Sequence, residues 1–154
     1  MNNRLTIVIG ADDAGEEMKN LLRSWLEKDA RVESLIDVGV NGGEATAYPH
    51  IGVEAARRVA AREADRALLV CGTGLGMAIS ANKVPGIRAV TAHDPYSVER
   101  SVLSNNAQVL CFGARVISAP LAMTLLDPWL DHRFDEDSPS SVKVAAITSY
   151  ESAT

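Results

Sequence analysis

Short apolar runs alternate with longer amphipathic segments along most of the chain. The first run covers residues 5–9, and the segment that follows has apolar residues at the spacing of a helix. This alternation repeats four more times. It predicts strands at 5–9, 32–38, 67–71, 87–92 and 108–112, and helices at about 18–26, 48–64, 77–83, 95–104 and 121–130.

The predicted strands are apolar throughout rather than at alternate residues. Strands of this kind are buried on both faces, which is typical of a parallel sheet covered by helices on each side. The prediction is therefore an α/β fold, a three-layer α/β/α sandwich around a five-stranded parallel sheet, in a Rossmann-like arrangement. A chain of 154 residues is the right size for a single domain, residues 1–154.

Two prolines set the expected helix ends near the C-terminus. Pro128 interrupts the last strong apolar stripe, so we expect that helix to kink or end near Asp127. Ser138 and Pro139 are residue types preferred at the N-cap and at the first helical position. A final helix is therefore expected over residues 138–154.

Composition and charge exclude several classes of function. The chain is 47% hydrophobic and 23% charged, with a net charge of -5, so a general nucleic-acid or anionic-membrane surface is not expected. No apolar run approaches the ~20 residues of a membrane span, and we expect a cytoplasmic protein. A reducing compartment would keep Cys71 and Cys111 as thiols.

The most informative segment is the loop that follows the apolar run ending at Cys71. Its glycines allow a tight turn, and their N–H groups at the start of a helix can hold an anion, either a phosphate or a developing oxyanion. The same partial positive charge favours a thiolate at Cys71, which gives a base that works near neutral pH. The alternative is that Cys71 is a small apolar residue at a strand end. We prefer that alternative for Cys111, which lacks such a loop.

Dinucleotide binding is a competing interpretation of this loop, because Asp94 lies near the distance of a ribose-binding acid. The fingerprint is imperfect, since Met77 stands where its third glycine should be and the loop follows the third strand instead of the first. The sequence therefore disfavours a nucleotide cofactor.

Other polar residues follow the predicted strands or lie in connections. Asp12 and Asp13 come after the first strand and can contact hydroxyl groups, although either one can instead cap a helix. The three histidines and two cysteines lack metal-ligand spacing, so no metal site is expected. Arg133 lies in a charged connection from which it can reach a phosphate.

Several sequence blocks together resemble type B ribose-5-phosphate isomerase, in the family that also includes lactose-operon galactose-6-phosphate isomerase. The resemblance covers about residues 5–147. The blocks are Gly10-Ala11-Asp12, Tyr48-Pro49-His50, Cys71-Gly72-Thr73-Gly74-Leu75-Gly76, Ala81-Asn82-Lys83, Gly86-Ile87-Arg88-Ala89-Val90 and Gly113-Ala114-Arg115-Val116. Across its whole length the chain looks closest to a tetrose-phosphate branch, the D-erythrulose 4-phosphate isomerases.

The resemblance implies an aldose–ketose isomerase without metal or cofactor, acting through a cis-enediol. It makes Cys71 the catalytic base, and Thr73 a residue for ring opening and proton handling. It assigns the anion hole to the amides of Gly72, Gly74, Leu75 and Gly76. It places Asp12, Tyr48 and Asn105 at the substrate, and makes Arg115 and Lys143 candidates for phosphate binding. It also implies a homodimer in which the partner subunit completes each site.

Two departures from the ribose enzymes affect the expected substrate. Asp13 stands where they have histidine, and a carboxylate repels a phosphate. Ser104 stands where they have the ring-opening histidine. A tetrose with phosphate on O4 cannot close a furanose, so it needs no ring opening. We therefore expect D-erythrulose 4-phosphate and D-erythrose 4-phosphate as substrates.

Two alternatives remain open at this point. One is isomerisation of ribose 5-phosphate and ribulose 5-phosphate, with Thr73, Ser104 or a water opening the ring. The other is a non-catalytic module that binds a sugar phosphate or a nucleotide. Cys71 discriminates between an enzyme and a binder, because only the enzyme requires a base.

Overall fold

The computed structural model describes residues 3–153 and has five strands and six α-helices in that range. The strands are β1 (Leu5–Ala11), β2 (Val32–Asp37), β3 (Arg66–Cys71), β4 (Ala89–Thr91) and β5 (Val109–Gly113). The helices are α1 (Glu16–Glu27), α2 (Tyr48–Ala60), α3 (Leu75–Ala81), α4 (Pro95–Leu103), α5 (Ala119–Trp129) and α6 (Ser141–Ser149), followed by a 3-10 turn, Tyr150–Ala153.

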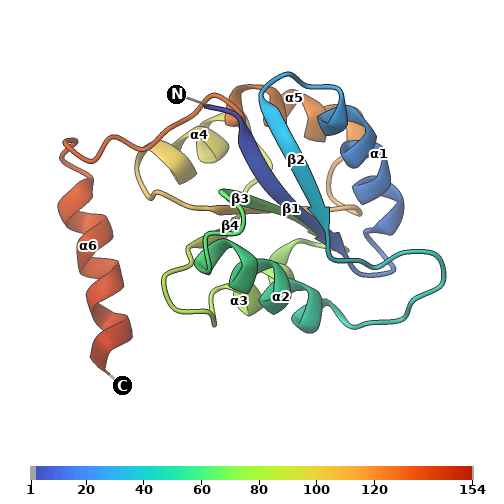
Figure 1. Ribbon diagram of the computed structural model, residues 1–154, viewed down its shortest axis with the longest axis horizontal. Coiled ribbons are helices and arrows are strands. Elements are labelled where there is room, and N and C mark those ends of the chain that lie inside the picture. The colour runs from blue at the N-terminus through green and yellow to red at the C-terminus, as the bar shows by residue number, and fades with distance from the viewer. Residues whose placement is uncertain (1–2, 154) are drawn as a thin grey trace.

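The strands form one parallel sheet in the order β2-β1-β3-β5-β4 (Figure 1). Helices α1, α4 and α5 pack on one face of the sheet, and α2 and α3 pack on the other. Each face has its own cluster of buried apolar residues. This is the predicted three-layer α/β/α sandwich. β3 lies at the centre of the sheet and is buried at all six residues. Five of them, 67–71, form the predicted apolar run, and the sixth is Arg66.

Proline and a capping side chain begin two of the helices. The side chain of Asp94, the residue before Pro95, accepts a hydrogen bond from the Ser97 N–H. The side chain of Ser118 accepts one from the Leu121 N–H. Each cap satisfies an amide that the helix itself cannot pair, and a proline near the start has no such amide to satisfy. These signals explain why α4 begins at the predicted residue.

The predictions near the C-terminus were partly wrong. α5 continues through Pro128 to Trp129, since a proline in the last turn removes only one hydrogen bond. Ser138 is not a helix cap: its carbonyl accepts the Ser141 N–H in a turn, and α6 begins only at Ser141. Residue 154 of the predicted helix lies outside the described residues. Figure 1 shows α6 standing away from the sandwich, at the end of a long connection.

Within the described residues, no helix is both long and apolar enough to span a membrane.

Candidate active site

The carboxyl ends of β1 and β3 border one cavity of about 310 Å³. Such a position is where parallel α/β sheets usually hold their ligands. Eight of the site residues predicted from the sequence line this cavity. The cavity is lined by Asp12, Asp13, Ala14, Tyr48, Cys71, Gly72, Thr73, Gly76 and Arg115.

Cys71 is the last residue of β3, and its sulfur faces the glycine loop. The side chain is only 5% exposed but borders the cavity, and its Sγ accepts a hydrogen bond from the Gly74 N–H at 3.1 Å. Gly74 makes this contact with φ +80°, which side chains other than glycine rarely adopt. This contact fixes the position of the sulfur at the edge of the cavity.

The loop is held by the two strands on its far side. Thr91 at the end of β4 donates a hydrogen bond from its Oγ1 to the Gly74 carbonyl at 2.7 Å. Gly113 at the end of β5 lies so close to Thr73 that an added Cβ would be 2.7 Å from its backbone. These roles of Thr91 and Gly113 could not be predicted from the sequence, because nothing local to them indicates that they support a loop about 20 to 40 residues away in the chain.

Two of the amides predicted to form the anion hole have partners inside the loop. The Gly74 N–H binds the Cys71 sulfur, and the Leu75 N–H donates to the Thr73 hydroxyl at 3.3 Å. Gly72 and Gly76 border the cavity, whereas Gly74 and Leu75 are not among the residues that line it. Within the loop, these two amides therefore bind the Cys71 sulfur and the Thr73 hydroxyl. Gly72 instead borders the space where a ligand would lie.

Tyr48 reaches the cavity from the first turn of α2. Its ring lies directly against Gly76, where a Cβ would overlap the ring. The side chain is 39% exposed, so the ring covers the loop on one side and faces solvent on the other. A glycine at position 76 is required for this contact.

Charged residues complete the rim of the cavity. Asp12 accepts the Gly15 N–H and Asp13 accepts the Ala14 N–H, both at 3.0 Å, so each also orders the turn before α1. The Arg115 guanidinium lies across Gly72, where an added Cβ would be 2.8 Å from Nη1. Among the described residues that line the cavity, Arg115 is the single cation.

Four predicted site residues lie away from the Cys71 cavity, namely Ser104, Asn105, Lys143 and Arg133. Ser104 ends α4, and Asn105 borders a second cavity of about 410 Å³ between β4 and α6. Lys143 is on α6, which stands apart from the sandwich. The structure of one chain does not bring these three to Cys71.

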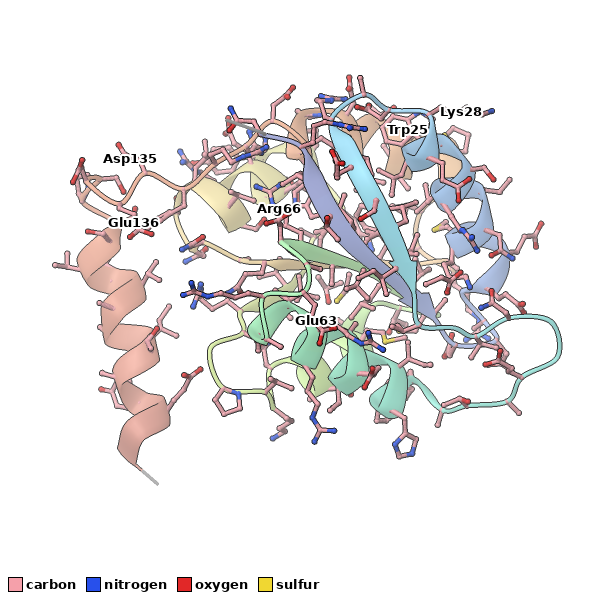
Figure 2. The ribbon with its side chains drawn as sticks, viewed as in Figure 1. Trp25, Lys28, Glu63, Arg66, Asp135 and Glu136 are labelled. Carbon is pink, nitrogen blue, oxygen red and sulfur yellow. The ribbon has the colours of Figure 1, made fainter. Side chains whose placement is uncertain are left out.

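Arg133 lies at the opposite edge of the sheet, where the strands begin. Its guanidinium donates to the carbonyls of Leu130, His132 and Asn3. Arg66 at the start of β3 lies beside it, and burial together with Arg133 lowers the pKa of Arg66 to about 10. Figure 2 shows Arg66 at this end of the sheet. Its guanidinium donates to the main-chain carbonyls of Trp129, the last residue of α5, and of His132. Both arginines thus serve main-chain carbonyls.

The geometry gives no support to the dinucleotide interpretation. Met77 is fully buried inside α3, and Asp94 is engaged as the cap of α4. Among residues 3–153 no group of three or more His, Cys, Asp or Glu side chains is arranged to hold a metal ion.

Comparison with known proteins identifies sugar and sugar-phosphate isomerases as relatives of this chain. Residues 7–147 match the family model described as Ribose/Galactose Isomerase. The chain is 61% identical to "D-erythrulose-4-phosphate isomerase 2" of Mycolicibacterium smegmatis, over 97% of this chain and 99% of that protein. It is 45% identical to "Ribose-5-P isomerase B" of Listeria innocua, over 84% of this chain and 86% of the relative.

A solved structure agrees with the sequence matches. The ribose-5-phosphate isomerase B of Clostridium thermocellum superposes with a TM-score of 0.90 at 37% identity, covering 96% of this chain and 98% of that one. The similarity thus extends over the sandwich, the glycine loop and α6 together.

Proposed function

The chain belongs to the Ribose/Galactose Isomerase family, and we propose that it interconverts D-erythrulose 4-phosphate and D-erythrose 4-phosphate. Its relatives are named sugar-phosphate isomerases, so the chain is an aldose–ketose isomerase. The observation that carries the choice of substrate is the 61% identity to a D-erythrulose-4-phosphate isomerase along 97% of the chain. A second relative with that activity in its name, from Pectobacterium atrosepticum, is 42% identical over 96% of the chain.

Chemistry at position 104 supports the same choice. Pentose and hexose phosphates exist largely as rings, and an isomerase for them needs an acid–base group to open the ring. Ser104, which takes the place of the ring-opening histidine, is a weak acid and a weak base near neutral pH. A tetrose phosphorylated on O4 is open already, so a site without that histidine can still act on it.

The thiolate of Cys71 begins the reaction. It removes a proton from C1 of the ketose, and the electron pair of that C–H bond forms the C1–C2 double bond of a cis-enediol while charge moves to the C2 oxygen. The same sulfur then returns the proton to C2, as the C1 oxygen loses its proton and becomes the aldehyde. One base suffices because C1 and C2 present the same face of the enediol to it.

Charge on the substrate oxygen is stabilised by the Gly72 end of the loop and by Thr73. Both border the cavity beside the sulfur, and preorganised donors of this kind act where charge develops in the transition state. The Thr73 hydroxyl, which accepts the Leu75 N–H, can move a proton between the two substrate oxygens. Asp12 and Tyr48 are positioned to contact the substrate hydroxyls.

The phosphate needs more positive charge than one chain supplies at the cavity. Arg115 is accompanied there by Asp12 and Asp13, so the described lining carries two carboxylates against one guanidinium. Lys143 from a partner subunit supplies the missing cation. Arg133 is the least suitable of the three predicted phosphate ligands, because its guanidinium already donates to carbonyls.

A two-fold dimer brings the separated residues together. The Cys71 cavity lies at the start of α3 and the Asn105 cavity at its end, where Asn82 lines it. Between them α3 exposes Leu75 and Ile79, which are 57% and 64% accessible. A two-fold axis at this apolar patch would place the Asn105 cavity of one subunit over the Cys71 cavity of the other.

We also propose a cytoplasmic location, where a catalytic thiol beside a second cysteine stays reduced.

Ribose 5-phosphate is the second candidate substrate, favoured by the match to the ribose-5-phosphate isomerase B structure. Measuring kcat/KM on phosphorylated tetroses, pentoses and hexoses distinguishes the two. We expect D-erythrulose 4-phosphate to be preferred by at least about tenfold, a difference of about 1.4 kcal/mol in transition-state binding. A preference for ribose 5-phosphate would refute the tetrose assignment.

A Cys71→Ala variant separates an isomerase from a non-catalytic binding module. The variant should lose kcat by several orders of magnitude and should no longer exchange the C1 proton of the ketose with deuterated solvent, while binding the substrate. Cys111→Ala is the matched control, because Cys111 is fully buried on β5 and does not border the cavity. A Cys71→Ala protein with unchanged turnover would exclude the proposed base.

A further inference from the structure

We infer that His93 is a positioning residue for the catalytic loop: its neutral imidazole holds the end of β5, and β5 in turn fixes the loop that carries Cys71. This inference rests on the proposed function, because it assigns His93 a role through Cys71. His93 does not line the Cys71 cavity, so it does not contact the substrate within one chain. It is one of three histidines, and no sequence motif gave it a function.

The first contact in this chain of support is a hydrogen bond from the Gly113 N–H to His93 Nε2, 2.9 Å long. An imidazole accepts at Nε2 only when it is neutral and carries its proton on Nδ1. The ring is partly buried and packs against Phe112, with 5.9 Å between ring centroids. Burial lowers the pKa of His93, whereas Asp94, the charged neighbour that acts on it, opposes that change. The surroundings therefore keep the ring in the accepting form.

The second contact joins Gly113 to the loop itself. Gly113 pairs with Cys71 across β5 and β3, and the next two residues bind the loop, with Ala114 N–H donating to the Cys71 carbonyl and Arg115 N–H to the Gly72 carbonyl. The distances are 2.8 and 3.0 Å. Gly113 also touches the Thr73 backbone with no room for a Cβ. A displacement of Gly113 therefore displaces Cys71, Gly72 and Thr73 together.

The loop has a second support from the same strand that leads to His93. Thr91 binds the Gly74 carbonyl, and a Cβ at Gly74 would be 2.9 Å from the Phe112 backbone. The direction of the Gly74 N–H toward the Cys71 sulfur is thus set by β4 and β5 and not by the loop alone. Catalytic groups commonly need such a supporting layer to hold them within a fraction of an ångström of the productive geometry.

The test compares three substitutions in the full-length protein. His93→Leu fills similar space without an acceptor, whereas His93→Gln keeps a side-chain oxygen that can accept the Gly113 N–H and cannot titrate. The matched control is His132→Gln, since His132 is also partly buried with a pKa lowered by burial, but its backbone carbonyl binds Arg66 at the opposite edge of the sheet.

We expect His93→Leu to lower kcat by about ten- to a hundredfold, with KM changed by less than about threefold, since the reacting groups move while the binding residues remain. His93→Gln should restore kcat to within about threefold of the original protein, and His132→Gln should leave it unchanged. If His93→Leu matches the original kcat, or if Gln fails to rescue a folded protein, the inference is wrong.

A second measurement does not depend on the substrate. Cys71 should react with iodoacetamide more slowly in His93→Leu than in the original protein at pH 7, because the Gly74 N–H no longer holds its sulfur in the reactive position beside the cavity. The buried Cys111 is not expected to react in either. An unchanged Cys71 alkylation rate would overturn the positioning role. If this rate changes while no sugar phosphate is converted by the original protein, the proposed function fails and the positioning role stands.

Discussion

At the scale of single residues, the absence of a side chain at Gly76 is as important as the groups that carry chemistry. The Tyr48 ring occupies the space that a Cβ on Gly76 would need. Because Gly76 lies in the first turn of the seven-residue α3, an alanine there would be favourable for the isolated helix by about 1 kcal/mol. Contact with Tyr48 therefore outweighs helix propensity at this position.

A Gly76→Ala substitution tests this contact directly. We expect kcat/KM to fall at least about tenfold, because the ring must move out of the cavity that it lines. The matched background is Tyr48→Ala, which removes the ring atoms that the added methyl group would overlap. If the two positions act through each other, Gly76→Ala should cost little further activity in that background, as a double-mutant cycle measures. Fully additive losses would contradict the contact.

Ser104 is the second residue whose chemistry carries a prediction. Ser104→His introduces an imidazole at the position that the resemblance to the ribose enzymes assigns to a ring-opening histidine, so ring opening should become possible. We expect activity on ribose 5-phosphate to rise by about a hundredfold or more, the usual contribution of one acid–base group, while activity on D-erythrulose 4-phosphate changes little. Ser101→Ala on the same helix serves as a control, since that buried hydroxyl donates only to the Val98 carbonyl. An equal rise on both sugars would show that ring opening is not the limiting step.

At the scale of secondary-structure elements, a buried ion pair ties α1 to the end of β2. Lys19 on α1 is fully buried, and its Nζ donates to both Asp37 carboxylate oxygens at 3.1 Å and to the Val40 carbonyl at 2.7 Å. Burial by itself would raise the pKa of Asp37, but the Gly39 N–H and Lys19 together lower it. The segment after β2 then pairs with the end of β1, directly before Asp12.

Removing Lys19 should therefore destabilise the protein more than removing its exposed neighbour. Lys19→Met leaves the partly buried Asp37 without the cation that binds both of its carboxylate oxygens, and we expect a loss of roughly 3 kcal/mol in the free energy of unfolding. Arg23→Gln removes the other cation at Asp37, but Arg23 is 43% exposed and its loss should cost less than about 1 kcal/mol. Urea unfolding of both variants measures the difference. Equal effects would mean that solvent screens both pairs alike.

The elements could be predicted from the sequence more completely than the contacts between them. Apolar runs indicate the strands, even in β2, where residues 33–34 are exposed and the strand is not buried on both faces as predicted. The glycines after Cys71 mark the loop, and both signals are local. Lys19 shows the limit: a lysine between apolar positions reads as a solvated residue, and only the folded chain brings Asp37 to it. The surroundings of Asn105 could not be predicted for the same reason. The cavity that it borders lies between β4 and α6, which are far apart in the sequence.

At the scale of the whole molecule, two partly buried histidines predict how stability depends on pH. Burial lowers the pKa of both His93 and His132 in the folded state. Below about pH 6.5 the unfolded chain thus binds more protons than the folded chain, so stability is full above that pH and falls as the pH decreases. We expect the urea midpoint to drop between pH 7.5 and 5.5, and to drop less in a His93→Gln, His132→Gln double variant. An identical drop in the double variant would assign the effect to other groups.

The proposed dimer makes a prediction that concerns two chains at once. If one subunit supplies Cys71 and the other supplies Asn105, each of the variants Cys71→Ala and Asn105→Ala should be inactive, since every site in either homodimer contains a defect. Subunit exchange between them produces mixed dimers, in which one site carries both defects and the other carries none. When the two are mixed in equal amounts, half of the dimers are mixed, so activity should return to about a quarter of the original.

The same experiment distinguishes the dimer from a site built within one chain. If Cys71 and Asn105 served the same site in one chain, every site in the mixture would still hold one defect, and no activity would return. Ile79→Asp provides the structural control, because a charge in the exposed apolar patch of α3 should prevent association. Mixed variants that also carry Ile79→Asp should then stay inactive and sediment as monomers. If the Ile79→Asp variants still formed dimers and regained activity on mixing, α3 would not be the contact, and the completing residues would have to reach Cys71 along another face.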